Sequence, residues 1–120
     1  MIADALKVNH SLQAFSFDSN NIGADGAKEI ADALKVNHSL KLLGLIDNKI
    51  GDNGAKTIVD ALQVNQTLES LNLGCNDICA DGAKMIADAL QNTHSLKTLD
   101  LAYNPIGNDG QSYLEKKCMN

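Results

Sequence analysis

The chain of 120 residues contains no arginine and no tryptophan, and only four of its residues are aromatic. All ten basic side chains are lysines, so the chain offers neither a bidentate guanidinium fork for phosphate nor an arginine finger. No apolar run reaches the length of a membrane span, and the N-terminus lacks the basic start and apolar stretch of a signal peptide. These absences argue against a membrane protein and against a secreted one.

The overall charge is negative. Fifteen acidic residues against ten lysines give a net charge of −5, which disfavours binding to nucleic acid or to an anionic membrane. The length fits one domain, and a hydrophobic content of 44% is ordinary for a soluble globular protein. We therefore expect a single cytoplasmic domain.

The sequence is built from internal repeats. The opening MIADAL recurs at residues 85–90, and a period of 28 aligns Leu12, Leu40, Leu68 and Leu96. The predicted domain therefore spans residues 1–120, with a partial unit 1–11 and units 12–39, 40–67, 68–95 and 96–120. Met1 takes the place of Met85, inside a helix.

Each unit has two halves with different hydrophobic periods. In the first half, the alternation of Leu43 and Leu45 predicts a short, half-buried strand. In the second half, Ala27, Ile30 and Leu34 lie three and four residues apart, as on one face of a helix. A strand and a returning helix, repeated at a fixed period, predict a curved solenoid with a parallel sheet and helices on one face only.

Polar residues of the helical half have predicted structural roles. Four of them stand just before the apolar stripe and suit helix N-caps, each contributing about 1 kcal/mol: Asp25, Asn53, Asp81 and Asp109. Three pairs four residues apart are expected on the outer helix face: Lys28–Asp32, Lys56–Asp60 and Lys84–Asp88.

The pattern LxxLxLxxNxI closely resembles the leucine-rich repeat. The repeat length and the GAxxIAxAL half are similar to the ribonuclease-inhibitor type, and NOD-like receptors and Ran GTPase-activating proteins carry similar units. The resemblance covers residues 1–117 and implies an α/β fold, a right-handed βα horseshoe arc with the parallel sheet on its concave face and helices on its convex face. Phe15 and Phe17 depart from the pattern, as does the last unit at Gln111, Glu115 and Lys117.

An asparagine stands at position nine of every unit. These residues are Asn20, Asn48, Asn76 and Asn104. A polar binding row is one interpretation, but an inward amide that satisfies backbone groups where the strand turns is the better one. The resemblance implies the same role.

No catalytic, cofactor or metal site is predicted, and we do not expect an enzyme. The three N-x-S/T triplets, at residues 9–11, 37–39 and 65–67, follow from the repeat and are not expected to carry glycans. His10 and His38 share one position but lack further metal ligands. Cys75, Cys79 and Cys118 are expected to be reduced thiols, with Cys118 packed as a small hydrophobe.

The outward positions three, five, seven and eight of the strand half vary between units, whereas the helical positions repeat nearly unchanged. Alternation places the variable side chains on the concave wall. Exposed apolar groups with an aromatic residue and a polar rim are typical of protein-binding patches, although scattered apolar groups are also common on soluble proteins. The candidate protein-binding residues are Leu42, Ile46, Asn72, Asp100, Tyr103, Asp18 and Asp47.

We therefore predict a non-catalytic module that binds a protein partner of unknown identity on its concave face. The alternatives are a regulator of an enzyme, such as a GTPase activator, and a self-associating fragment of a longer array. The second alternative follows from the N-terminal edge, where Ile2, Leu6, Phe15 and Phe17 are expected to be covered on one side only. The polar run at residues 115–117 resembles a cap on the other end.

Overall fold

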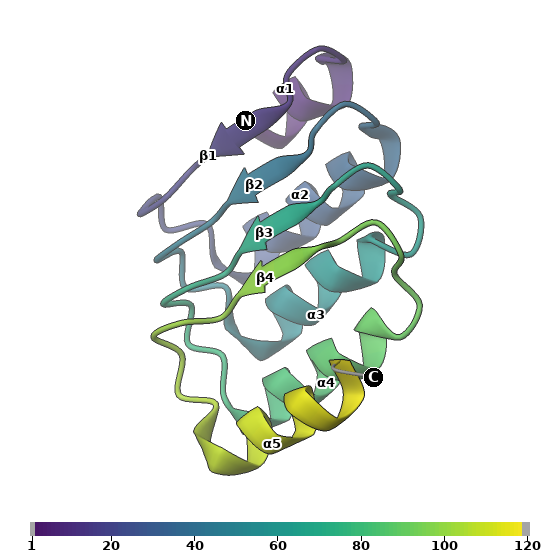
Figure 1. Ribbon diagram of the computed structural model, residues 1–120. Helices are drawn as coiled ribbons and strands as arrows, with labels where there is room; N and C mark the ends of the chain where they lie inside the picture. Colours follow the sequence, from purple (N-terminus) through teal and green to yellow (C-terminus); the bar gives the residue numbers. More distant parts are fainter. Residues whose placement is uncertain (1, 119–120) are drawn as a thin grey trace.

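The computed structural model describes residues 2–118, without the side chains of Ile2 and Cys118. Helices and strands alternate along this part of the chain (Figure 1). The helices are α1 (Ile2–Val8), α2 (Gly23–Val36), α3 (Gly51–Ala61), α4 (Ala80–Leu90) and α5 (Gly107–Cys118). The strands are β1 (Ala14–Ser16), β2 (Leu42–Gly44), β3 (Ser70–Asn72) and β4 (Thr98–Asp100). The predictions for Met1 and for the side chains of Ile2 and Cys118 lie outside the described residues.

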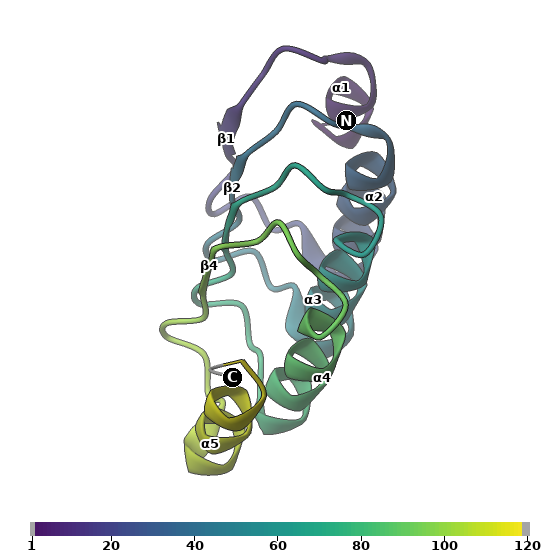
Figure 2. The ribbon, with the colours of Figure 1, turned by 45° about the vertical axis from the view of Figure 1, so that its right-hand side comes forward.

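The four strands form one parallel sheet in the order β1-β2-β3-β4. The register joins equivalent residues of neighbouring repeats, so that Ala14, Leu42, Ser70 and Thr98 lie in one row across the sheet. Helices cover one face of the sheet and leave the other open, and the two layers run side by side along the array (Figures 1 and 2). The predicted α/β solenoid is confirmed. We call the open face the strand face.

None of the helices in the described part of the chain is long and apolar enough to cross a membrane.

The core fills the space between the two layers. Leu43 and Leu71 of neighbouring strands are buried against the inner faces of the helices, whereas Phe15 and Leu99, their equivalents in the outer strands, are only half-buried. A strand with one neighbour leaves one side of its inward side chain uncovered. The expectation that Leu6 is also half-covered is wrong, because α1 packs against α2 and leaves Leu6 only 2% exposed.

The asparagines at position nine have the predicted structural role. Asn76 is fully buried, and its Oδ1 accepts hydrogen bonds from the backbone N–H groups of Asn48 (2.8 Å) and Ile50 (3.3 Å) in the preceding repeat. Its Nδ2 donates to the carbonyl oxygens of Leu45 (2.8 Å) and Gly74 (3.0 Å). One amide therefore satisfies four backbone groups and ties two repeats together.

A second row of buried asparagines lies where each helix returns to the next strand. Asn65 Nδ2 donates to the carbonyl oxygens of Leu34 and Asn37, both at 2.8 Å, and Asn37 makes the equivalent bonds to Leu6 and Asn9. This row was not predicted from the sequence, where only the N-x-S/T triplets that contain it stood out. The triplets therefore have a structural origin: the amide nitrogens of Asn37 and Asn65 are buried and already bonded.

The predicted helix N-caps are wrong. Helices α2, α3 and α5 begin at glycines with φ of +68° to +74°, two residues before the expected caps. Asp25 is therefore the third helical residue, and the residue before α2, Ile22, caps nothing through its side chain. A left-handed glycine sharply redirects the chain into the helix, so the carboxylate lies in the first turn, where it interacts favourably with the helix dipole.

One of the three predicted ion pairs on the outer helix face is present, between Lys56 and Asp60 at 2.6 Å. Asp32 instead lies 3.9 Å from Lys35, and Asp88 accepts a hydrogen bond of 2.6 Å from the Tyr113 hydroxyl. Tyr113 comes from the next helix, so Asp88 links α4 to α5. This bond raises the pKa of the Tyr113 phenol, because Asp88 favours its protonated form.

We expect Asn76→Ala to lower the free energy of unfolding by about 3 kcal/mol, because it leaves four backbone groups without their partner in the core. Asn20→Ala is the matched control at the same repeat position. Asn20 is exposed and its side chain donates to the nearby Asp18 carbonyl oxygen, so its loss should cost under about 1 kcal/mol. Urea unfolding followed by circular dichroism measures both. Equal losses would contradict a role based on burial.

Candidate functional site

The strand face consists mainly of small side chains. One row across the sheet is Ala14, Leu42, Ser70 and Thr98, and the next is Ser16, Gly44, Asn72 and Asp100. Leu42 stands out, because its neighbours are too short to cover it and 46% of its surface is exposed. The structure therefore places one large apolar group near the middle of this face.

Ile46, the second predicted apolar residue, lies two residues beyond the end of β2. A step of four residues spans about 13 Å when fully extended, and Ile46 lies outside the paired rows of the sheet that contain Leu42. Ile46 is half-buried, and its Cγ1 lies 3.8 Å from where a Cβ on Gly74 would be. Ile46 therefore packs beside Gly74 of the neighbouring repeat, at a distance where even a Cβ would make only an ordinary contact.

Three of the predicted polar residues also fix the backbone where the strands end. Asp18 Oδ1 accepts from the Ile46 N–H, and Asp100 Oδ1 accepts from the Ala102 N–H, both at 2.9 Å. Asn72 Oδ1 accepts from Gly74 at the same distance. The sequence pattern indicated only a binding role for these residues. Asp18 and Asp100 nevertheless remain exposed and give this face its negative charge.

Alternation predicted that the residues at position eight lie on the strand face, but the structure places them on the loops that follow the strands. Asp47 and Tyr103 have φ of +58° and +62°, so the backbone turns there and their side chains lie on the loops that follow the strands. Asp47 Oδ2 accepts from the Ser19 hydroxyl at 3.0 Å. Tyr103 is 90% exposed in a conformation that costs energy for a bulky residue. The rest of the fold gains no packing from that ring.

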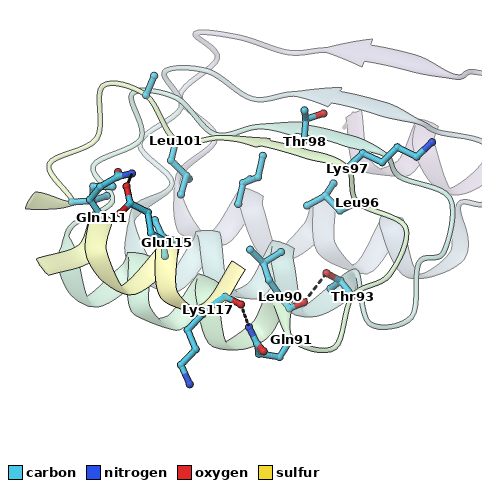
Figure 3. A pocket seen from close by; sticks show the side chains of 14 residues that line it. Leu90, Gln91, Thr93, Leu96, Lys97, Thr98, Leu101, Gln111, Glu115 and Lys117 are labelled. Atoms are coloured by element: carbon cyan, nitrogen blue, oxygen red, sulfur yellow. Dashed lines mark hydrogen bonds between the residues drawn. The ribbon is translucent and has the colours of Figure 1, made fainter. Parts of the chain in front are cut away.

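Two hollows adjoin this surface. One of about 440 Å³ lies over β3 and β4 and is lined in part by Ser70, Asn72, Thr98 and Asp100 of the strand face. The other, of about 680 Å³, lies between β4 and the helices α4 and α5 (Figure 3). Its apolar lining is contributed mainly by Leu90, Leu96, Leu99, Leu101, Ile106 and Leu114.

The polar residues of α5 cover this end of the array only in part. Lys117 accepts a hydrogen bond of 2.9 Å at its carbonyl oxygen from Gln91, which joins α5 to α4 (Figure 3). Glu115 bonds to Gln111 along the same helix at 3.1 Å. Neither bond reaches β4. Leu99 of this strand and Leu101 just after it stay half-exposed. These bonds of the polar run therefore lie within the helix layer and do not cover the sheet layer.

Chemically reactive groups are few in the described residues. Within residues 2–118, no three histidine, cysteine or acidic side chains come together as they would around a metal ion. Cys75 and Cys79 are free and exposed on the loop that follows β3. The strand face thus combines small side chains, one exposed leucine and two carboxylates, with an exposed tyrosine on the loop at its edge.

Comparisons with known proteins identify the repeat and the fold. A family model described as "Leucine Rich repeat" matches residues 8–31, 36–59, 64–87 and 92–114. The solved structure of the leiomodin-1 actin-binding site 2 is similar with a TM-score of 0.84 and 24% identity, covering 95% of this chain and 68% of that one. The tropomodulin C-terminal domain of Caenorhabditis elegans has a TM-score of 0.81 and 12% identity, covering 96% and 72%. No curated protein sequence gives a significant match.

We expect two thiols of the native protein, those of Cys75 and Cys79, to react rapidly with Ellman's reagent, because both are exposed and unpaired. Titration of the unfolded protein without reductant should find all three cysteines free. The Cys75→Ser and Cys79→Ser variants should each lose one rapid equivalent. A Cys75–Cys79 disulfide in the purified protein would contradict the prediction.

Proposed function

Because this chain belongs to the leucine-rich repeat family, we propose that it is a non-catalytic module that binds a partner protein on its strand face. The observation that carries the proposal is Leu42, 46% exposed on a face of small side chains. A large apolar side chain that projects from among small ones can enter a partner's pocket, and such buried anchors contribute most of the binding energy at protein interfaces. Asp18 and Asp100 then supply the polar surroundings.

Tyr103 is the second anchor of the proposed interface. Tyrosine is enriched in interface hot spots, because its ring buries a large area while its hydroxyl keeps a hydrogen bond. Here the ring is held on a turn after β4, two repeats away from the end of β2. A partner that contacts both Leu42 and Tyr103 would cross three of the four strands.

The structural neighbours support a protein as the partner. One of them is the actin-binding site 2 of leiomodin-1, which makes actin the first partner to test for this chain. Exposed unpaired thiols suit a reducing compartment, so we place the protein in the cytoplasm.

Self-association is a second mode of binding that β1 favours. Within the described residues, β1 pairs with β2 on one side only, and edge strands with free backbone groups are templates for pairing with another chain. Phe15 in β1 and Phe17 just after it are half-buried, and their rings stack at 5.7 Å. Sedimentation velocity across micromolar concentrations should show a dimer, and Ala14→Pro should reduce it. A monomer at every concentration would contradict this prediction.

We expect Leu42→Asp with Ile46→Asp, and separately Tyr103→Ala, to weaken partner binding at least tenfold. The matched control replaces Lys28, Lys56 and Lys84 on the outer helices with glutamine, which should change affinity less than twofold. Co-sedimentation with actin filaments and binding to fluorescent actin monomers measure the first candidate. A quantitative pull-down with mass spectrometry, comparing the double variant with the wild type, identifies others. Equal losses from the helix and strand-face variants would rule the proposed interface out.

A further inference from the structure

The net charge of −5 conceals an uneven distribution between two edges of the array. The segments from strand to helix (residues 18–25, 46–53, 74–81 and 102–109) carry seven aspartates and one lysine. The segments from helix to strand (residues 7–13, 35–41, 63–69 and 91–97) carry four lysines and one glutamate. Because all strands are parallel, each set of segments lies along one edge of the molecule (Figure 1). One edge is strongly acidic and the opposite edge is basic.

The basic edge also carries a row of exposed valines. Val8, Val36 and Val64 occupy the same position in three successive repeats and are 75%, 49% and 54% exposed. The next repeat has Asn92 at this position, also exposed. The fold therefore accepts a polar residue at this position, and packing of the core does not require valine there. We call Val8, Val36 and Val64, together with Lys7, Lys35 and Lys41, the valine edge.

The valine edge is held rigidly. Val36 and Val64 directly precede the buried asparagines Asn37 and Asn65. Those asparagines each donate to two carbonyl oxygens of the preceding repeat and accept from the chain that leads into the next strand. The exposed valines thus sit on backbone that is already ordered, which lowers the entropy cost of binding.

Charge and spacing indicate what would cover this edge. Within residues 2–118, Lys7 and Lys41 have no carboxylate partner, and Lys35 lies only at 3.9 Å from Asp32. Packed helices lie about 8–10 Å apart, and two turns of an α-helix rise about 11 Å. A helix with an apolar residue every seven positions and carboxylates beside them would meet successive valines and lysines. The acidic edge of a second copy fits less well, since Tyr103 is its one large exposed apolar side chain among the described residues.

We propose that the valine edge is a second docking surface, separate from the strand face, which binds an acidic amphipathic helix of a partner protein. The apolar stripe of that helix covers Val8, Val36 and Val64, and its carboxylates pair with Lys7, Lys35 and Lys41. The two surfaces would let the module hold two protein segments at once.

The test uses two synthetic 21-residue helical peptides that share a leucine stripe of seven-residue period. One has glutamate beside the stripe and the other has lysine at the same positions. Fluorescence anisotropy should show binding of the glutamate peptide alone, weakened by raising the salt concentration. Val36→Asn with Val64→Asn, which copies Asn92, should weaken it at least tenfold, and so should Lys35→Glu with Lys41→Glu. Circular dichroism confirms that each variant is folded.

Leu42→Asp with Ile46→Asp is the control that separates the two surfaces and should leave affinity for the glutamate peptide within twofold. Loss of binding in this control would assign the peptide to the strand face and overturn the proposal. So would equal affinity for the two peptides, or an unchanged affinity in the valine variant. A wild-type dimer in sedimentation that the valine variant abolishes would also overturn it, because a second copy would then occupy the edge instead.

Discussion

The structure depends on one interaction repeated along the array, the asparagine amide that joins the ends of β2, β3 and β4 to the repeat before each of them. In the middle of the array, Asn48 and Asn76 each bond to four backbone groups. A backbone that turns inside a core must have its N–H and C=O groups satisfied, and the amide supplies a donor and an acceptor in one short side chain. The 28-residue period is thereby converted into a fixed register between neighbouring strands.

This register decides what the surface can display. The residues after each strand, such as Asp47 and Tyr103, are held at positive φ by the turn that the asparagine completes. The second asparagine row, with Asn37 and Asn65, fixes the opposite loops in the same way. Both edges of the solenoid are therefore ordered, and the side chains that they expose vary without cost to the core. Repeat architecture separates a constant interior from variable faces, each of which can bind something different.

Charge follows the same separation. Aspartates gather on the strand-to-helix segments, where helix N-termini favour negative charge. Lysines lie in the last turns of α1, α2 and α5, whereas α3 and α4 have no basic residue there. The helix dipole accounts for Asp25 and Lys35, which lie in the first and last turns of α2. It does not account for Lys41 or Lys97, which precede strands. The helix dipole thus explains only part of the separation between acidic and basic edges. This separation gives the strand face and the valine edge different electrostatic surroundings.

The sequence by itself determined the repeat, the alternation of strand and helix, the inward leucines such as Leu43 and Leu45, and the role of Asn76, because each follows from a local period. Only the tertiary structure decided which candidate residues meet. Stacking brings Gly74 beside Ile46, which half-covers that side chain, and leaves Leu42 exposed between Ala14 and Ser70. The left-handed glycines moved the helix starts ahead of Asp25, and the turn after the strand carried Tyr103 off the strand face. The physical reason is that these positions depend on contacts between residues a full repeat apart. The sequence period predicts that such residues are neighbours, but the packed backbone decides which of their side chains touch.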